Sequence, residues 1–156
     1  YEKANELDPS NLIYYDLAFA RYAAGNKNGA MDAILRHMDY FTRDEMGFYF
    51  GGIVASETGR LNEAVQYFNQ AIAINNTIHQ FYMKRADVLF QQQKLNEAIA
   101  DYSVVIGMDP SNGEAYYIRG NAKGTLLDRT GACADWQKAV ELGFEDSNGY
   151  IRDLCK

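Results

Sequence analysis

The feature that most constrains the fold is a 34-residue repeat that runs through nearly the whole chain. Small residues recur at this interval in two registers: Ala30, Ala64, Ala98 and Ala132, and also Ala18, Gly52, Ala86 and Gly120. Larger residues recur in two more: Tyr14, Phe48, Tyr82 and Tyr116, and also Ile34, Phe68, Tyr102 and Trp136. Four registers in phase indicate one supersecondary unit that is copied and stacked. We therefore expect each repeat to bury its apolar face against its neighbours.

Each repeat is predicted to contain a helix, a turn and a second helix, because the apolar period is helical on both sides of a break near its middle. The breaks fall near Gly25, Gly59, Gln93 and Leu127. We expect first helices near 11–24, 45–58, 79–92 and 113–126, and second helices near 28–41, 62–75, 96–109 and 130–142. Side-chain oxygens that can accept from free helix N–H groups predict the caps. For the second helices these are Asn28, Asn62, Asn96 and Thr130, and for the first helices Ser10 or Asn11, Asp44, Thr77, and Ser111 or Asn112.

Composition narrows the class of partner. Of the 156 residues, 47% are apolar and 23% are charged, as in soluble globular proteins. The net charge of −6 and the scattered Lys and Arg disfavour nucleic acid, whose phosphates require clustered positive charge. No apolar run approaches the roughly 20 residues of a membrane-spanning helix. We expect a soluble protein, and the choice between the cytoplasm and an exported or periplasmic location stays open.

The repeats resemble tetratricopeptide repeats (TPR). In the third repeat the matching residues are Tyr82, Ala86, Leu89, Ala98, Tyr102 and Pro110. The resemblance implies an all-α fold, a right-handed superhelix (TPR solenoid) of four repeats at 11–44, 45–78, 79–112 and 113–146. It also implies a protein-binding role. The pattern Cys-x-Asp-Trp with a final Cys resembles bacterial repeat proteins, some of which are exported.

Both ends of the chain carry further predictions. Residues 1–10 resemble the closing half of a preceding repeat, from which we infer that the chain is a fragment of a longer array. Residues 147–156 are predicted to form a C-terminal capping helix, because Ile151, Leu154 and Cys155 make one apolar stripe. Cys133 and Cys155 form either a disulfide that fastens this cap or two buried free thiols, and both interpretations stay open.

In the TPR family the first helices line a groove with the second, fifth, ninth, twelfth and thirteenth residues of each repeat, which we call the groove positions. They are mostly apolar and aromatic in the first two repeats and more polar in the last two. Such aromatic and Met side chains are typical of binding sites, and also of packing between helices. The predicted partner-binding residues are Tyr15, Phe19, Tyr22, Tyr49, Ile53, Met83, Asp87, Phe90, Tyr117 and Asn121.

Two features shape the functional prediction. Tyr15 and Phe19 occupy places where the family's Lys and Asn clamp grips acidic chaperone tails, so a partner with apolar anchors is favoured. No metal-ligand spacing surrounds His37 or His79, and no nucleophile elbow or phosphate loop is present. We expect a non-catalytic scaffold for a protein or peptide partner, without cofactor or metal. The alternatives are a structural spacer, a module that self-associates through its open N-terminal end, and a regulatory array of a larger protein with an enzymatic domain.

Overall fold

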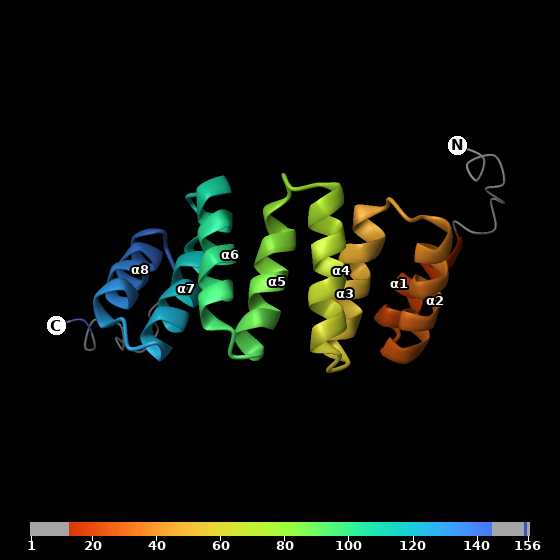
Figure 1. The fold of residues 1–156 in the computed structure, drawn as a ribbon, viewed down its shortest axis with the longest axis horizontal. Helices are drawn as coiled ribbons and strands as arrows, with labels where there is room; N and C mark the ends of the chain where they lie inside the picture. The colour runs from red at the N-terminus through yellow and green to blue at the C-terminus, as the bar shows by residue number, and fades with distance from the viewer. Residues whose placement is uncertain (1–12, 145–154, 156) are drawn as a thin grey trace. The chain divides into compact units, whose positions relative to one another are not determined.

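The computed structural model describes residues 13–144 and residue 155. Within them the chain forms eight α-helices and no strand (Figure 1). They belong to two compact units, Tyr1–Thr77 (unit 1) and Ile78–Lys156 (unit 2). The predicted half repeat at 1–10 and all of the predicted capping helix except Cys155 lie outside the described residues. None of the described helices is both long and apolar enough to cross a membrane.

Unit 1 contains the first two predicted repeats. Its helices are α1 (Ile13–Ala23), α2 (Lys27–Tyr40), α3 (Glu45–Glu57) and α4 (Leu61–Ile74). Helix α1 packs on α2, α3 packs on α4, and α2 contacts α3. The two helix pairs are therefore stacked within the unit, as the repeat pattern predicts.

Unit 2 contains the third and fourth repeats. Its helices are α5 (His79–Gln91), α6 (Leu95–Met108), α7 (Gly113–Thr125) and α8 (Arg129–Glu141). Helix α5 packs on α6, α7 packs on α8, and α6 contacts α7. The same stacking thus occurs in both units.

The predicted caps of the second helices are wrong by two residues. The observed N-caps are Asn26, Arg60, Lys94 and Asp128. The reason lies in the turn, where the preceding residue has a left-handed backbone: Gly25, Gly59, Gln93 and Leu127 have φ of 79°, 78°, 60° and 64°. This conformation reverses the chain so tightly that the residue directly after it is already the N-cap, two residues earlier than predicted. Asn26 and Asp128 accept from the backbone N–H of Gly29 and Gly131, both at 2.9 Å.

The first helices follow their predicted caps more closely. Asp44 accepts from the backbone N–H of Met46 at 3.0 Å, and Asn112 accepts from that of Ala115 at 2.9 Å, so these two predictions are confirmed. The prediction of Thr77 is wrong. Its hydroxyl donates to Asn75 Oδ1 at 2.7 Å, and the N-cap residue is Ile78.

In the second and fourth repeats a glycine of the first helix meets a large residue of the second. A Cβ atom added to Gly52 would lie 2.5 Å from the ring of Phe68, and one added to Gly120 would lie 2.6 Å from the indole of Trp136. The recurring alanines of the second helices, Ala30, Ala64, Ala98 and Ala132, are fully buried. Two of the sequence registers therefore interlock in these repeats, and this contact fixes how α3 and α7 present their groove positions.

Candidate functional site

In unit 1 the aromatic groove positions of α1 surround one ring of α3. Phe50 is 7% exposed, and its ring centroid lies 5.9 Å from that of Tyr15, 6.0 Å from Phe19 and 5.4 Å from Tyr22. Tyr15 also lies 5.3 Å from His37. These rings therefore hold α1 against α3, which is the packing interpretation of the sequence pattern.

Hydrogen bonds fix Tyr22 further. Its hydroxyl donates to Glu57 Oε1 at 2.6 Å, and Lys27 pairs with the same carboxylate at 3.0 Å. The hydrogen bond to Glu57 is the main reason why the pKa of Tyr22 is raised. Burial likewise raises the pKa of Tyr15. Both phenols are therefore held in their neutral form.

Two groove positions in unit 1 nevertheless present large apolar side chains to solvent. Phe19 is 58% exposed although its ring touches Phe50, and Met46 is 43% exposed. Tyr49, whose ring lies 5.9 Å from that of Phe68, and Ile53 are half-buried. The face of α1 and α3 therefore combines a fixed aromatic base with an exposed ring.

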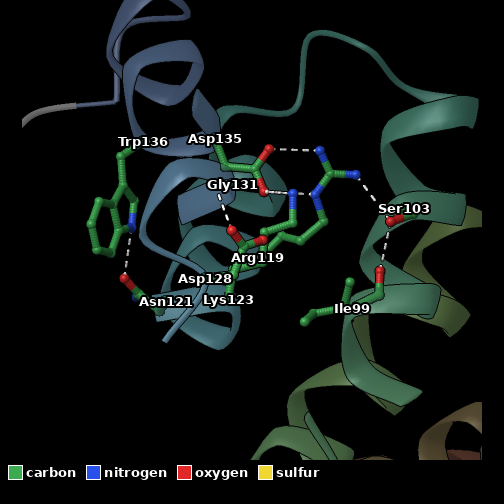
Figure 2. Close-up of polar contacts among 9 residues, drawn as sticks. All are labelled: Ile99, Ser103, Arg119, Asn121, Lys123, Asp128, Gly131, Asp135 and Trp136. Atoms are coloured by element: carbon green, nitrogen blue, oxygen red, sulfur yellow. Dashed lines mark hydrogen bonds and ion pairs between the residues drawn. The ribbon is translucent and has the colours of Figure 1, made fainter. Parts of the chain in front are cut away.

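In unit 2 the polar groove positions serve the repeat's own core. The Tyr102 hydroxyl donates to Asp87 Oδ1 at 2.9 Å, and Trp136 Nε1 donates to Asn121 Oδ1 at 2.9 Å (Figure 2). Burial is the main cause that raises the pKa of Tyr102. The equivalent pairs in unit 1, Ile34 with Phe19 and Phe68 with Ile53, are apolar. The ninth position is thus polar in the two repeats where the facing ring of the second helix carries a polar atom.

The other predicted residues of unit 2 differ in accessibility. Met83 is 8% exposed and lies in the core. Tyr117 stacks on Phe144 with ring centroids 4.5 Å apart, and Phe90 is half-buried. The structure therefore separates Met83 from the groove positions that keep some exposed surface.

A polar network that the sequence reading missed joins the helices of unit 2 (Figure 2). Arg119 donates to both carboxylate oxygens of Asp135, at 2.8 and 2.7 Å, and Lys123 pairs with Asp135 at 2.8 Å. Arg119 also donates to the hydroxyl of Ser103, which donates to the carbonyl of Ile99. The third repeat has the same kind of ion pair, in which Arg85 donates to both carboxylate oxygens of Asp101 at 2.7 Å. We call this two-bond arrangement a fork.

These ion pairs form another register of the 34-residue period. Arg85 and Arg119 are 34 residues apart, as are Asp101 and Asp135, and the first repeat has Leu17 and Ala33 in these places. Asp101 and Asp135 are only 6% and 4% exposed. A comparison of charged residues across the repeats would have revealed these two ion pairs, because Arg and Asp recur together at the 34-residue period. A buried carboxylate needs such a partner.

Cys133 and Cys155 are joined by a disulfide in the structure. Cys133 lies on α8 and is half-buried, as is Cys155. The bond therefore fastens residue 155 to the second helix of the fourth repeat.

The helix pairs define a protein of the α-helical repeat class, and comparison with known proteins finds family models that match two of its segments. Residues 52–78 match the family model described as tetratricopeptide repeat, and residues 86–126 match one described as TPR repeat. Two segments of the chain thus match tetratricopeptide repeats, and the predicted fold class is confirmed.

One curated relative and two solved structures illustrate the similarity in sequence and in fold. The TPR repeat-containing thioredoxin TDX of Arabidopsis thaliana is 32% identical over 97 residues, which are 62% of this chain and 26% of that protein. The structure of MamA superposes with a TM-score of 0.84 at 23% identity, covering 92% of this chain and 84% of that one. The first TPR of Spaghetti (RPAP3), solved with the HSP90 peptide SRMEEVD, gives 0.72 at 23% identity, covering 75% and 93%. The chain spans between 16% and 26% of the length of four curated relatives that it matches.

Proposed function

We propose that this chain is a scaffold that binds a segment of a partner protein on the first helices of its repeats, without catalysis. The observation that carries the proposal is the ring of Phe19, which is 58% exposed at a groove position and rests on the fixed aromatic base around Phe50. A large ring on a rigid support gives contact area with little entropy to lose on binding. A TPR that binds an HSP90 peptide supports the same class of function.

The side chains favour a partner with apolar anchors over an acidic tail. The fifth and ninth positions hold Tyr15 and Phe19 in the first repeat, Tyr49 and Ile53 in the second, Met83 and Asp87 in the third, and Tyr117 and Asn121 in the fourth. None of them is cationic, and Asp87 would repel a carboxylate. We therefore expect a partner segment whose binding depends on apolar contact with Phe19.

The test is capture of partners from the source organism with the parent protein and two matched variants. Phe19→Ser removes the exposed ring. Ile13→Ser removes a side chain on the same helix that is 59% exposed but lies outside the groove positions. We expect Phe19→Ser to lose at least about tenfold of the retained partner, the equivalent of about 1.4 kcal/mol. Ile13→Ser should retain it, and circular dichroism confirms that both variants are folded.

A competition experiment distinguishes a partner with apolar anchors from one with an acidic tail. Excess SRMEEVD peptide should not displace the captured protein, and its displacement would show that the chain binds an acidic tail. Equal retention by parent and Phe19→Ser would contradict the proposed surface. If the captured protein is a second copy of this chain, the self-association alternative replaces the scaffold.

We also propose an oxidising compartment, as for an exported bacterial protein. The support is the disulfide between Cys133 and Cys155, since such bonds persist mainly outside the reducing cytosol.

A further inference from the structure

A pocket of about 300 Å³ lies in unit 1, beside α1 and α2. Its lining residues share one property, which is that none of them is a groove position. They are Tyr14, Leu17, Arg21, Asp32, Ala33 and Arg36. The pocket is therefore a different place from the surface proposed around Phe19.

The pocket lies where the third and fourth repeats have their forks. Leu17 stands in the register of the fork arginines, and Ala33 stands in that of the fork aspartates. In the fourth repeat the carboxylate of Asp135 fills this place and accepts two hydrogen bonds from Arg119 (Figure 2). Because the side chain of Ala33 ends at Cβ, the first repeat has no carboxylate there.

The second repeat fills the same place in another way. Its residues in the two registers are Gly51 and Tyr67. The Cδ2 atom of Tyr67 lies 3.8 Å from a Cβ atom added to Gly51, so the phenol ring packs on the backbone of α3. Only the first repeat therefore has neither a carboxylate nor a ring in these two registers.

The first repeat keeps a cation at this place although it lacks the carboxylate. In the third and fourth repeats Cζ of the fork arginine lies 5.5 Å from the ring centroid of Tyr82 or Tyr116. Tyr14 is the equivalent ring, and Cζ of Arg36 lies 5.9 Å from its centroid. A guanidinium of α2 thus stacks on the ring that a guanidinium of the first helix covers in the other two repeats.

A second guanidinium belongs to the wall of the pocket. Arg21 donates through Nη1 to the carbonyl of Gly29 at 2.9 Å, which holds its side chain in place. Within residues 13–144, no ion pair joins Arg21 or Arg36 to Asp32 or to any other carboxylate. Two cations and one anion therefore line the pocket, which favours an anionic ligand.

We propose that this pocket is a binding site for an aliphatic carboxylate, which accepts hydrogen bonds from Arg36 and Arg21. Guanidinium groups bind carboxylates through short, charge-assisted hydrogen bonds, and the forks show that bond in the equivalent place. Leu17 and Ala33 provide an apolar wall for the methylene groups of such a ligand. The site goes beyond the proposed function, because no groove position takes part in it.

The carboxylate has two possible sources. One is a separate molecule, such as a peptide with a glutamate side chain. The other is the chain itself, whose first ten residues include Glu2, Glu6 and Asp8. These three residues lie outside the described residues, so the experiment has to distinguish the two sources.

The probe is N-acetyl-glutamate amide, whose only charge is the side-chain carboxylate, and N-acetyl-glutamine amide is its neutral control. The Nε–H signals of Arg21 and Arg36 in a nitrogen-edited NMR spectrum of the parent protein report on binding. We expect the glutamate probe to shift them with a Kd of about 1–10 mM, as for two charge-assisted hydrogen bonds in an open pocket. The glutamine probe should bind at least about tenfold more weakly.

Four single variants test the residues of the site. Arg36→Gln and Arg21→Gln should each weaken probe binding at least about fivefold, whereas Arg43→Gln removes the same charge from an exposed position of unit 1 outside the pocket and should not. Ala33→Asp places a carboxylate in the register of the fork aspartates and should abolish the shift. Circular dichroism verifies that each variant is folded, and the two exposed or half-buried arginine positions keep the test valid if Ala33→Asp is not.

A variant of the first ten residues, Glu2→Gln/Glu6→Gln/Asp8→Asn, separates the sources. If the probe binds the parent, the site accepts a separate molecule. If it binds only this variant, the chain's own carboxylate occupies the site in the parent. Absence of a saturable shift in both proteins would overturn the inference, as would equal shifts by the glutamate and glutamine probes. Undiminished binding to both Arg36→Gln and Arg21→Gln would overturn it too, and none of these results affects the surface around Phe19.

Discussion

At the scale of single residues, the third and fourth repeats differ from the first in how they fill one buried place. They have the forks of Arg85 with Asp101 and Arg119 with Asp135, where the first repeat has Leu17 and Ala33. Breaking a buried ion pair leaves an uncompensated charge, whereas replacing both partners by apolar residues is often nearly neutral. Equivalent places in the chain thus hold a buried ion pair in two repeats and two apolar residues in another.

This comparison gives the first stability prediction. Asp101→Ala should lower the free energy of unfolding by about 3–5 kcal/mol, because Arg85 would lose a carboxylate that is only 6% exposed. The double variant Arg85→Leu/Asp101→Ala reproduces the residues of the first repeat and should lose less than the single variant. Urea denaturation measures both. A double variant as unstable as the single one, or less stable, would mean that the pair itself contributes net stability.

The sequence predicts which residues occupy the groove positions, but not which of them are already engaged. Asp87 and Asn121 look like free polar contacts because their partners, Tyr102 and Trp136, are 15 residues away on the other helix of the pair. Helical periodicity describes neighbours three or four residues apart and does not report on contacts across a turn. The hydrogen bonds therefore require the structure.

At the scale of helices, the close approach of α3 and α4 gives the second prediction. Gly52→Ala should lower the free energy of unfolding by about 1–3 kcal/mol, because its Cβ would lie 2.5 Å from the buried ring of Phe68. The loss should occur although alanine favours a helix by about 1 kcal/mol over glycine.

Two further variants control for helix propensity and test the contact. Gly107→Ala, in a helix where nothing lies within 4 Å of the added Cβ, should be neutral or stabilising. Gly52→Ala/Phe68→Ile copies the combination Ala18 and Ile34 of the first repeat and should recover part of the loss. Chemical denaturation of the parent and the three variants measures their free energies of unfolding. An equal change from Gly52→Ala and from Gly107→Ala would refute the packing argument.

Helix positions are predictable to within a few residues, and the caps show why the error remains. Side-chain chemistry favours Asn62 and Asn96 as caps, yet the helices begin after Arg60 and Lys94, which make no side-chain cap bond. The left-handed turn residue sets the start of the helix, and at Gln93 and Leu127 it is not a glycine that the sequence would reveal. Backbone geometry here outweighs capping preference.

At the scale of the whole molecule, the disulfide gives the last prediction. Cys133 and Cys155 are separated by 22 residues, so Cys133→Ser/Cys155→Ser should lower the free energy of unfolding of unit 2 by about 2–4 kcal/mol through loss of the closed loop. The emission of Trp136, the only Trp of the chain, follows unit 2 during thermal unfolding. The parent in a strong reductant should match the variant. Equal stability of oxidised parent and variant would contradict a stabilising bond.

The fold class follows from the repeat period, because one period determines helix number, order and packing partners together. The functional surface follows less well, because a ring on a first helix has the same spacing whether it packs or binds. Phe19 and Met83 are both apolar residues at groove positions, yet Phe19 is 58% exposed and Met83 is 8% exposed. Exposure depends on what covers each side chain, and local periodicity does not contain that information.

The left-handed turns give the chain one more property, which concerns protein engineering. Each repeat is a homologue of the other three, so the sequence contains a small alignment of itself. At the turn, two members of that alignment have glycine, and two, Gln93 and Leu127, hold a conformation that strains an ordinary residue by about 1–2 kcal/mol. A designer who wants a more heat-resistant protein can find Gln93→Gly without any outside sequence. The alignment offers the same change for Leu127, whose side chain is 89% exposed.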